Sequence, residues 1–95
     1  MGPNFFVAGA PKCGTTALIE YLRNHPQVFV SSVKEPHYFA DDIAGLRSMS
    51  RRSDYEELFR GADKRHAAVG EGSVFYLYSE EALPRIRQYS PEARV

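Results

Sequence analysis

A glycine-rich turn near the N-terminus carries residue types that bind phosphate and sulfate groups. It follows an apolar run at residues 5–9, contains Lys12 and Gly14, and leads directly into Thr15 and Thr16. The apolar run is typical of a strand buried on both faces, and helical spacing follows the turn. The first N–H groups of a helix have no internal partners, and the helix dipole adds partial positive charge there. Because lysine adds a charge and threonine adds a hydroxyl donor, the sequence predicts an anion site at this turn.

The position of the lysine argues against a nucleotide triphosphatase. Such enzymes need G-x-x-x-x-G-K-[ST], in which the lysine directly follows the last glycine. Gly9 and Gly14 have this spacing, but Thr15 stands where the lysine belongs, and the lysine of the turn is Lys12. A nucleotide kinase or triphosphatase stays open as an alternative enzyme class, which Mg²⁺-dependent nucleotide binding would favour.

A second group of candidate residues, Glu35 and His37, follows a short apolar run at residues 28–30. That run is predicted to be a strand, and ligands of open α/β sheets bind beyond the carboxyl ends of strands. The two groups are therefore expected to face one crevice. Glu35 or His37 could accept a proton from an acceptor hydroxyl, and Lys12 could stabilise a leaving phosphate. Pro36 favours an extended backbone at Glu35.

The turn resembles the 5'-phosphosulfate loop of sulfotransferases that use 3'-phosphoadenosine 5'-phosphosulfate (PAPS). Residues 11–18 match the family pattern P-K-[SCGT]-G-T-T followed by an apolar residue. The resemblance implies a PAPS site without metal and sulfuryl transfer to a hydroxyl or amine acceptor, which could be a carbohydrate. The implied cofactor-binding residues are Pro11, Lys12, Cys13, Gly14, Thr15 and Thr16.

The second group carries the same resemblance. Residues 34–39 are similar to the K-E-x-H-[FY]-F segment of the glycosaminoglycan and related bacterial sulfotransferases. The resemblance implies that Glu35 is the catalytic base and that His37 lines the acceptor site. Together with Lys12 as the catalytic cation, these are the candidate catalytic residues. Which of Glu35 and His37 is the base stays open.

A third segment, residues 70–77, resembles the family's G-E-[KS]-[ST]-P-x-Y-[LF] sequence near the acceptor and the sulfuryl group. Several members carry a lysine after the glutamate, and that lysine helps to hold the sulfuryl group. Gly72 stands at that position in this chain, and Val74 replaces the usual proline. Glu71 either has a function or pairs with a basic residue, and both alternatives stay open.

The elements that must position these residues can be located from their spacing and end signals. Strands are expected at residues 5–9, 28–30 and 67–70, and helices at 15–24, 53–61 and 81–89. The first strand, the first helix and the second strand are expected to form one βαβ unit. Ser53 and Glu56 have the spacing of a capping box at the start of the second helix. Tyr38 and Phe39, in a loop at 31–49, are expected to join the core.

Composition excludes several classes of function. Twelve basic and twelve acidic residues cancel, so no global positive field favours nucleic acid. Cys13 is the single cysteine, which excludes an intrachain disulfide, and no spacing of histidine or cysteine indicates a metal site. With no signal peptide or membrane-spanning run in the sequence, we expect a cytoplasmic protein whose partner is a small-molecule or glycan acceptor.

The pattern predicts one domain over residues 1–95 with an α/β fold, P-loop-like and three-layered around a central parallel sheet that is incomplete in this chain. Residues 93–95 look like the entry to a further strand. By resemblance, the chain is the N-terminal, 5'-phosphosulfate-binding part of a sulfotransferase domain, and a 3'-phosphate loop would follow that strand. Activity is then expected to need the missing C-terminal half or self-association, and the isolated chain is expected to be inactive. A non-catalytic binding or regulatory fragment is the third alternative.

Overall fold

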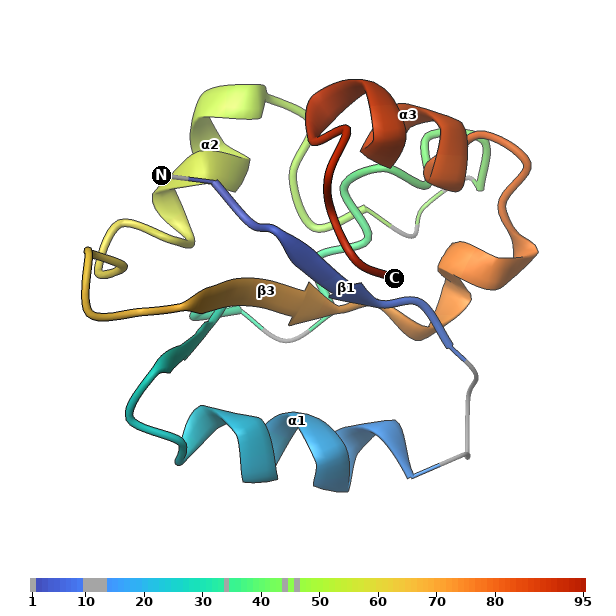
Figure 1. The fold of residues 1–95 in the computed structure, drawn as a ribbon. Coiled ribbons are helices and arrows are strands. Elements are labelled where there is room, and N and C mark those ends of the chain that lie inside the picture. The colour runs from blue at the N-terminus through green and yellow to red at the C-terminus, as the bar shows by residue number, and fades with distance from the viewer. Residues whose placement is uncertain (1, 10–13, 34, 44, 46) are drawn as a thin grey trace.

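The computed structural model describes residues 2–9, 14–33, 35–43, 45 and 47–95. Three predicted cofactor residues, Pro11, Lys12 and Cys13, lie outside the described residues. The order of elements is strand, helix, strand, helix, strand, a short 3-10 helix and a last helix (Figure 1). Each predicted strand and helix therefore has a counterpart, with bounds that differ by a few residues.

Three parallel strands form the central sheet: β1 (Phe5–Val7), β2 (Val28–Val30) and β3 (Ala68–Gly72). Their order is β1-β3-β2, so β3 pairs with both of the others. The predicted βαβ unit of residues 5–30 is present, since β1 and β2 run parallel in one sheet and α1 connects them, but β3 lies between its two strands. The strand β3 can lie directly beside β1 because Gly70 has no side chain. A Cβ there would lie 2.4 Å from the ring of Phe5 on β1.

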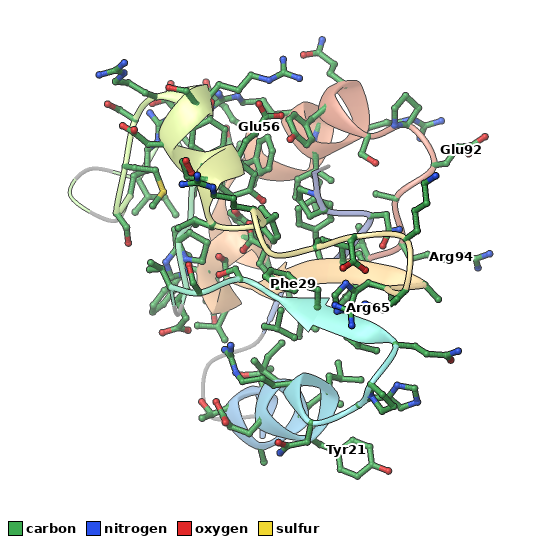
Figure 2. The ribbon with its side chains drawn as sticks, turned by 90° about the vertical axis from the view of Figure 1, so that its left-hand side faces the viewer. Tyr21, Phe29, Glu56, Arg65, Glu92 and Arg94 are labelled. Atoms are coloured by element: carbon green, nitrogen blue, oxygen red, sulfur yellow. The ribbon has the colours of Figure 1, made fainter. Side chains whose placement is uncertain are left out.

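Helices cover both faces of the sheet. The helix α1 (Thr15–Arg23) packs on one face, while α2 (Arg52–Glu57) and α3 (Ala82–Tyr89) lie on the other (Figure 1). The outer side of α1 faces solvent, and Tyr21 there is 76% exposed and points away from the sheet (Figure 2). This arrangement confirms the predicted three-layer α/β fold with an incomplete parallel sheet.

Most of the core lies between the sheet and the α2 and α3 layer, and aromatic side chains dominate it. Tyr38 stacks on Tyr55 with ring centroids 4.4 Å apart, and Phe39 meets Phe6 edge to face. Aromatic pairs of this kind stabilise beyond the area that they bury. The expectation that Tyr38 and Phe39 join the core is confirmed, since they are 7% and 2% exposed.

The predicted capping box at the start of α2 is wrong. The helix begins at Arg52 after Arg51, and no side chain caps it. Ser53 therefore lies inside the first turn, where its hydroxyl cannot take the N-cap role. Glu56 has a tertiary partner instead: its carboxylate accepts a hydrogen bond of 2.6 Å from the Tyr89 hydroxyl of α3 (Figure 2).

The end of the chain returns to the sheet beside β1. Arg94 forms an isolated parallel bridge with Phe5, and the N–H of Phe6 donates to the Arg94 carbonyl at 2.9 Å. This agrees with the prediction that residues 93–95 lead into a strand. None of the helices in the described part of the chain is long and apolar enough to span a membrane.

Candidate functional site

The N-terminus of α1 follows the turn at which the sequence predicts an anion site. Gly14 precedes the helix with a φ of 78°, a left-handed conformation that glycine adopts without strain. Among the described residues no side chain caps this end, and its first turn contains no acidic residue. The free N–H groups and the helix dipole therefore favour an anion at this position.

A pocket of about 140 Å³ lies between α1, the ends of β2 and β3, and the loop after β2. Thr15 and Thr16 line it from the start of α1, and Glu35 lines it from the loop. The expectation that the two predicted groups face one crevice is confirmed for these three residues. Its other lining residues are Ile19, Glu20, Arg23, Val30, Ser31, Val33, Gly72 and Val74.

The sequence did not single out two charged residues of the pocket, Glu20 and Arg23. Arg23 donates a hydrogen bond of 3.3 Å to the carbonyl of Ser31, and its Nε lies 3.6 Å from a carboxylate oxygen of Glu20. Both belong to the stripe of α1 that contains Thr16, since helix residues three or four apart share a face. Helical spacing from the anion loop is the signal that could have identified them.

Glu35 and His37 have an unusual backbone conformation. Their φ angles are 48° and 51°, in the left-handed region. The expectation that Pro36 makes Glu35 extended is therefore wrong. A residue other than glycine costs about 1–2 kcal/mol in this conformation. Surrounding contacts must impose this conformation, and strain held in this way is frequent at functional sites.

His37 packs away from the pocket. It is 4% exposed, its backbone N–H donates to the Ser73 hydroxyl at 2.9 Å, and its Nε2 accepts from the N–H of Phe75 at 3.3 Å. Burial lowers the pKa of its imidazole, although the neighbouring Glu35 carboxylate opposes the shift. The ring is thus a neutral acceptor that fixes the start of the 3-10 helix (Val74–Tyr78). A catalytic role for His37 stays a prediction.

This arrangement predicts a loss of stability in mild acid. Because the folded-state pKa of His37 is lowered, the unfolded chain binds the proton more readily. The stability that neutral His37 contributes is present above about pH 6.5 and is lost as the pH falls through the folded-state pKa. Protonation also removes the acceptor for Phe75, a bond worth about 1 kcal/mol. Urea unfolding of the full-length gene product at pH 7.5 and 5.5 measures the difference.

The control uses two histidine variants. In His37→Asn, which suits a positive φ, the part of the pH dependence that comes from this ring should vanish. In His25→Asn, which changes a histidine that is exposed on the surface, the dependence should persist. An unchanged dependence in His37→Asn would contradict the role given to this ring.

Glu71 lies on the opposite side of β3 from the pocket. It pairs in register with Phe6 and points into the aromatic core, whereas the neighbouring Gly72 lines the pocket beside Ile19 of α1. Glu71 is fully buried, and its partners in the described residues are the hydroxyls of Tyr55, Ser73 and Tyr76. The sequence left open whether Glu71 has a function or pairs with a basic residue. Its contacts with the described residues are with hydroxyl groups and not with a basic side chain.

The sequence model of the Sulfotransferase family matches residues 3–93. The chain belongs to this sulfotransferase family. The family assignment favours sulfuryl transfer over the nucleotide kinase or triphosphatase alternative, and it confirms the resemblance seen in the three motifs.

This sulfotransferase chain is similar to several known proteins. It is 42% identical over 64 residues to carbohydrate sulfotransferase 15 of Homo sapiens, which covers 60% of the chain and 11% of that protein. It is 35% identical over 86 residues to the membrane-associated sulfotransferase kil1 of Dictyostelium discoideum, which covers 88% of the chain and 17% of that protein. The crystal structure of a sulfotransferase from Alicyclobacillus acidocaldarius superposes with a TM-score of 0.87 at 35% identity.

The chain spans only part of each of these relatives, including 42% of the Alicyclobacillus structure, although that match covers 98% of the chain. One relative is named as membrane-associated. The cytoplasmic location expected from the sequence therefore stays a prediction.

Proposed function

We propose that this sulfotransferase domain takes part in transfer of a sulfuryl group from PAPS to a hydroxyl or amine, with a carbohydrate as the favoured acceptor. One observation carries the proposal: the open N-terminus of α1 and the carboxylate of Glu35 line the same pocket. The family assignment supports the reaction class. The name of carbohydrate sulfotransferase 15 supports the class of acceptor.

On the donor side, the 5'-phosphosulfate would be held at the start of α1. Gly14 leaves room beside the helix start, since a Cβ there would lie within 4 Å of no atom of the described residues. Backbone N–H groups of the first turn and the hydroxyls of Thr15 and Thr16 supply donors. In the proposed site Lys12 adds the positive charge that stabilises the leaving phosphate, and Pro11 and Cys13 are the further cofactor-binding residues.

On the acceptor side, Glu35 would accept the proton of the attacking hydroxyl. A carboxylate within hydrogen-bond reach of that hydroxyl can raise the rate by about 100-fold or more. The acceptor oxygen forms a bond to sulfur while the bond from sulfur to the 5'-phosphate oxygen breaks. The proton goes to Glu35, and adenosine 3',5'-bisphosphate leaves with the electron pair of the broken bond.

We also propose that residues 1–95 form a single structural unit that supplies the 5'-phosphosulfate half of the site. The contacts to the adenosine 3'-phosphate would then come from other residues. The match to 42% of the solved Alicyclobacillus sulfotransferase supports this division.

Lys12→Ala tests the donor side. We expect this change to weaken binding of adenosine 3',5'-bisphosphate by about 10- to 100-fold, because a charge-assisted contact to phosphate contributes about 1.5–3 kcal/mol. Calorimetric titration of the full-length gene product measures the affinity. Lys64→Ala, which removes an exposed lysine from the segment before β3, is the control and should bind normally. Equal affinities for Lys12→Ala and the unaltered protein would refute the assignment of the turn.

A further inference from the structure

The segment that carries Glu35 is held by two hydrogen-bonded relays that converge on one buried carboxylate. In the first, the backbone N–H of His37 donates to the Ser73 hydroxyl at 2.9 Å, and that hydroxyl donates to Oε1 of Glu71. In the second, the N–H of Phe39 donates to the Tyr76 hydroxyl at 3.4 Å, and that hydroxyl donates to Oε2 of Glu71 at 2.8 Å.

The direction of these bonds depends on the charge of Glu71. An ionised carboxylate can only accept, so each hydroxyl must point its hydrogen at Glu71 and keep a lone pair for a backbone N–H. The Tyr55 hydroxyl donates to Oε2 as well, at 2.6 Å. Burial raises the pKa of Glu71, and the hydrogen bonds from Ser73, Tyr55 and Tyr76 oppose that rise. A buried carboxylate with three hydroxyl donors is a satisfied network, which makes it rigid.

Glu71 and Glu35 lie on different sides of the sheet. Glu71 points into the core layer that α2 and α3 cover, while Glu35 lines the pocket on the α1 side. The backbone of the segment that carries Glu35 has a positive φ at two residues, Glu35 and His37. The relays bind the N–H groups at positions 37 and 39. They therefore hold the backbone that begins two residues after Glu35.

We propose that Glu71 is a positioning residue for the reaction: through Ser73 and Tyr76 it holds the strained segment at residues 35–39 so that the Glu35 carboxylate faces the acceptor. This proposal rests on the proposed function, in which Glu35 is the base. A small displacement of a catalytic group lowers the rate steeply, whereas the proposed donor contacts at the start of α1 should be kept.

The test compares two matched tyrosine variants in the full-length gene product. Tyr76→Phe and Tyr55→Phe each remove one buried hydroxyl bound to Oε2 of Glu71, but only the Tyr76 hydroxyl also accepts a backbone N–H of the segment. Ser73→Ala removes the relay to His37 without changing the tyrosines. The measurements are kcat and KM with PAPS and a glycan acceptor, affinity for adenosine 3',5'-bisphosphate, and amide hydrogen exchange at residues 37 and 39.

We expect Ser73→Ala and Tyr76→Phe to lower kcat by about 10- to 100-fold and to keep the affinity for adenosine 3',5'-bisphosphate. Exchange should accelerate at residue 37 in Ser73→Ala and at residue 39 in Tyr76→Phe, by about fivefold or more. Tyr55→Phe should keep kcat within about threefold, although it should lower the free energy of unfolding by about as much as Tyr76→Phe does. Ser73→Thr, which restores a hydroxyl, should recover most of the rate.

Two results would overturn the proposal. If Tyr55→Phe lowers kcat as much as Tyr76→Phe, the network supports the fold without positioning the base. If exchange at residues 37 and 39 is unchanged in the two relay variants, the relays do not hold the segment. The exchange measurement needs no turnover, so it tests the network even if the unaltered protein transfers no sulfuryl group, a result that would count against the proposed function alone.

Discussion

Glu35→Gln should bind adenosine 3',5'-bisphosphate as tightly as the unaltered protein and lose about 100-fold or more in turnover. The amide has nearly the same shape as the carboxylate but cannot accept the acceptor proton. The proposed donor contacts are at the start of α1, another part of the pocket lining. Turnover of the full-length gene product with radiolabelled PAPS and a panel of glycan and alcohol acceptors measures the effect.

The companion variants make this result specific. Glu35→Asp keeps a carboxylate on a shorter side chain, so its loss should be smaller than that of Glu35→Gln. Glu57→Gln changes an exposed carboxylate on α2 that pairs with Arg60 at the surface, and it should retain normal turnover. Should Glu35→Gln turn over at a near-normal rate, Glu35 is not the base and His37 becomes the candidate.

Residues 1–95 expressed alone should show no measurable sulfuryl transfer. In sulfotransferases of the type that this chain resembles, an arginine and a serine of a second loop bind the 3'-phosphate, and no such loop is recognised in these residues. Each charge-assisted phosphate contact contributes about 1.5–3 kcal/mol, so the loss of two or three reduces affinity about 1,000-fold. Cofactor binding that is micromolar in a complete site would then be millimolar.

A chimera supplies the positive control. Residues 1–95 would be joined to the remaining part of the Alicyclobacillus sulfotransferase, whose fold the chain matches over 42% of that protein. The chimera should regain micromolar binding of adenosine 3',5'-bisphosphate by calorimetry, while the isolated residues stay millimolar. Robust, acceptor-dependent transfer by the isolated residues as a monomer would show that the site needs no further segment.

The local elements could be predicted from sequence because their signals are local. The apolar run at Phe5–Val7, the helical spacing after Gly14 and the apolar pair around Phe29 each fall within an observed element. The motif around Gly14 also predicted an anion site, since the first N–H groups of a helix have no internal partners and favour an anion. The family followed from these motifs and is confirmed.

Strand order and helix ends were decided by tertiary structure. The chain from β1 to β2 contains no signal that β3, nearly forty residues further on, inserts between them. Pairing of that kind depends on which buried surfaces fit, as Gly70 fits the ring of Phe5. The start of α2 likewise departs from the local signal, since Glu56, the expected capping-box partner of Ser53, accepts a hydrogen bond from Tyr89 of α3.

The sequence determined the chemistry of the site, and the tertiary structure decided its geometry. Glu35 was recognisable as a candidate base from the motif, but its positive φ contradicts the local preference that Pro36 creates. The nearby N–H of His37 donates to Ser73, 36 residues further along the chain, and the Ser73 hydroxyl donates in turn to Glu71. The three hydroxyls that satisfy this buried carboxylate come from Tyr55 on α2 and from Ser73 and Tyr76 after β3. Its role therefore cannot be inferred from any one segment and emerges only when the segments pack together.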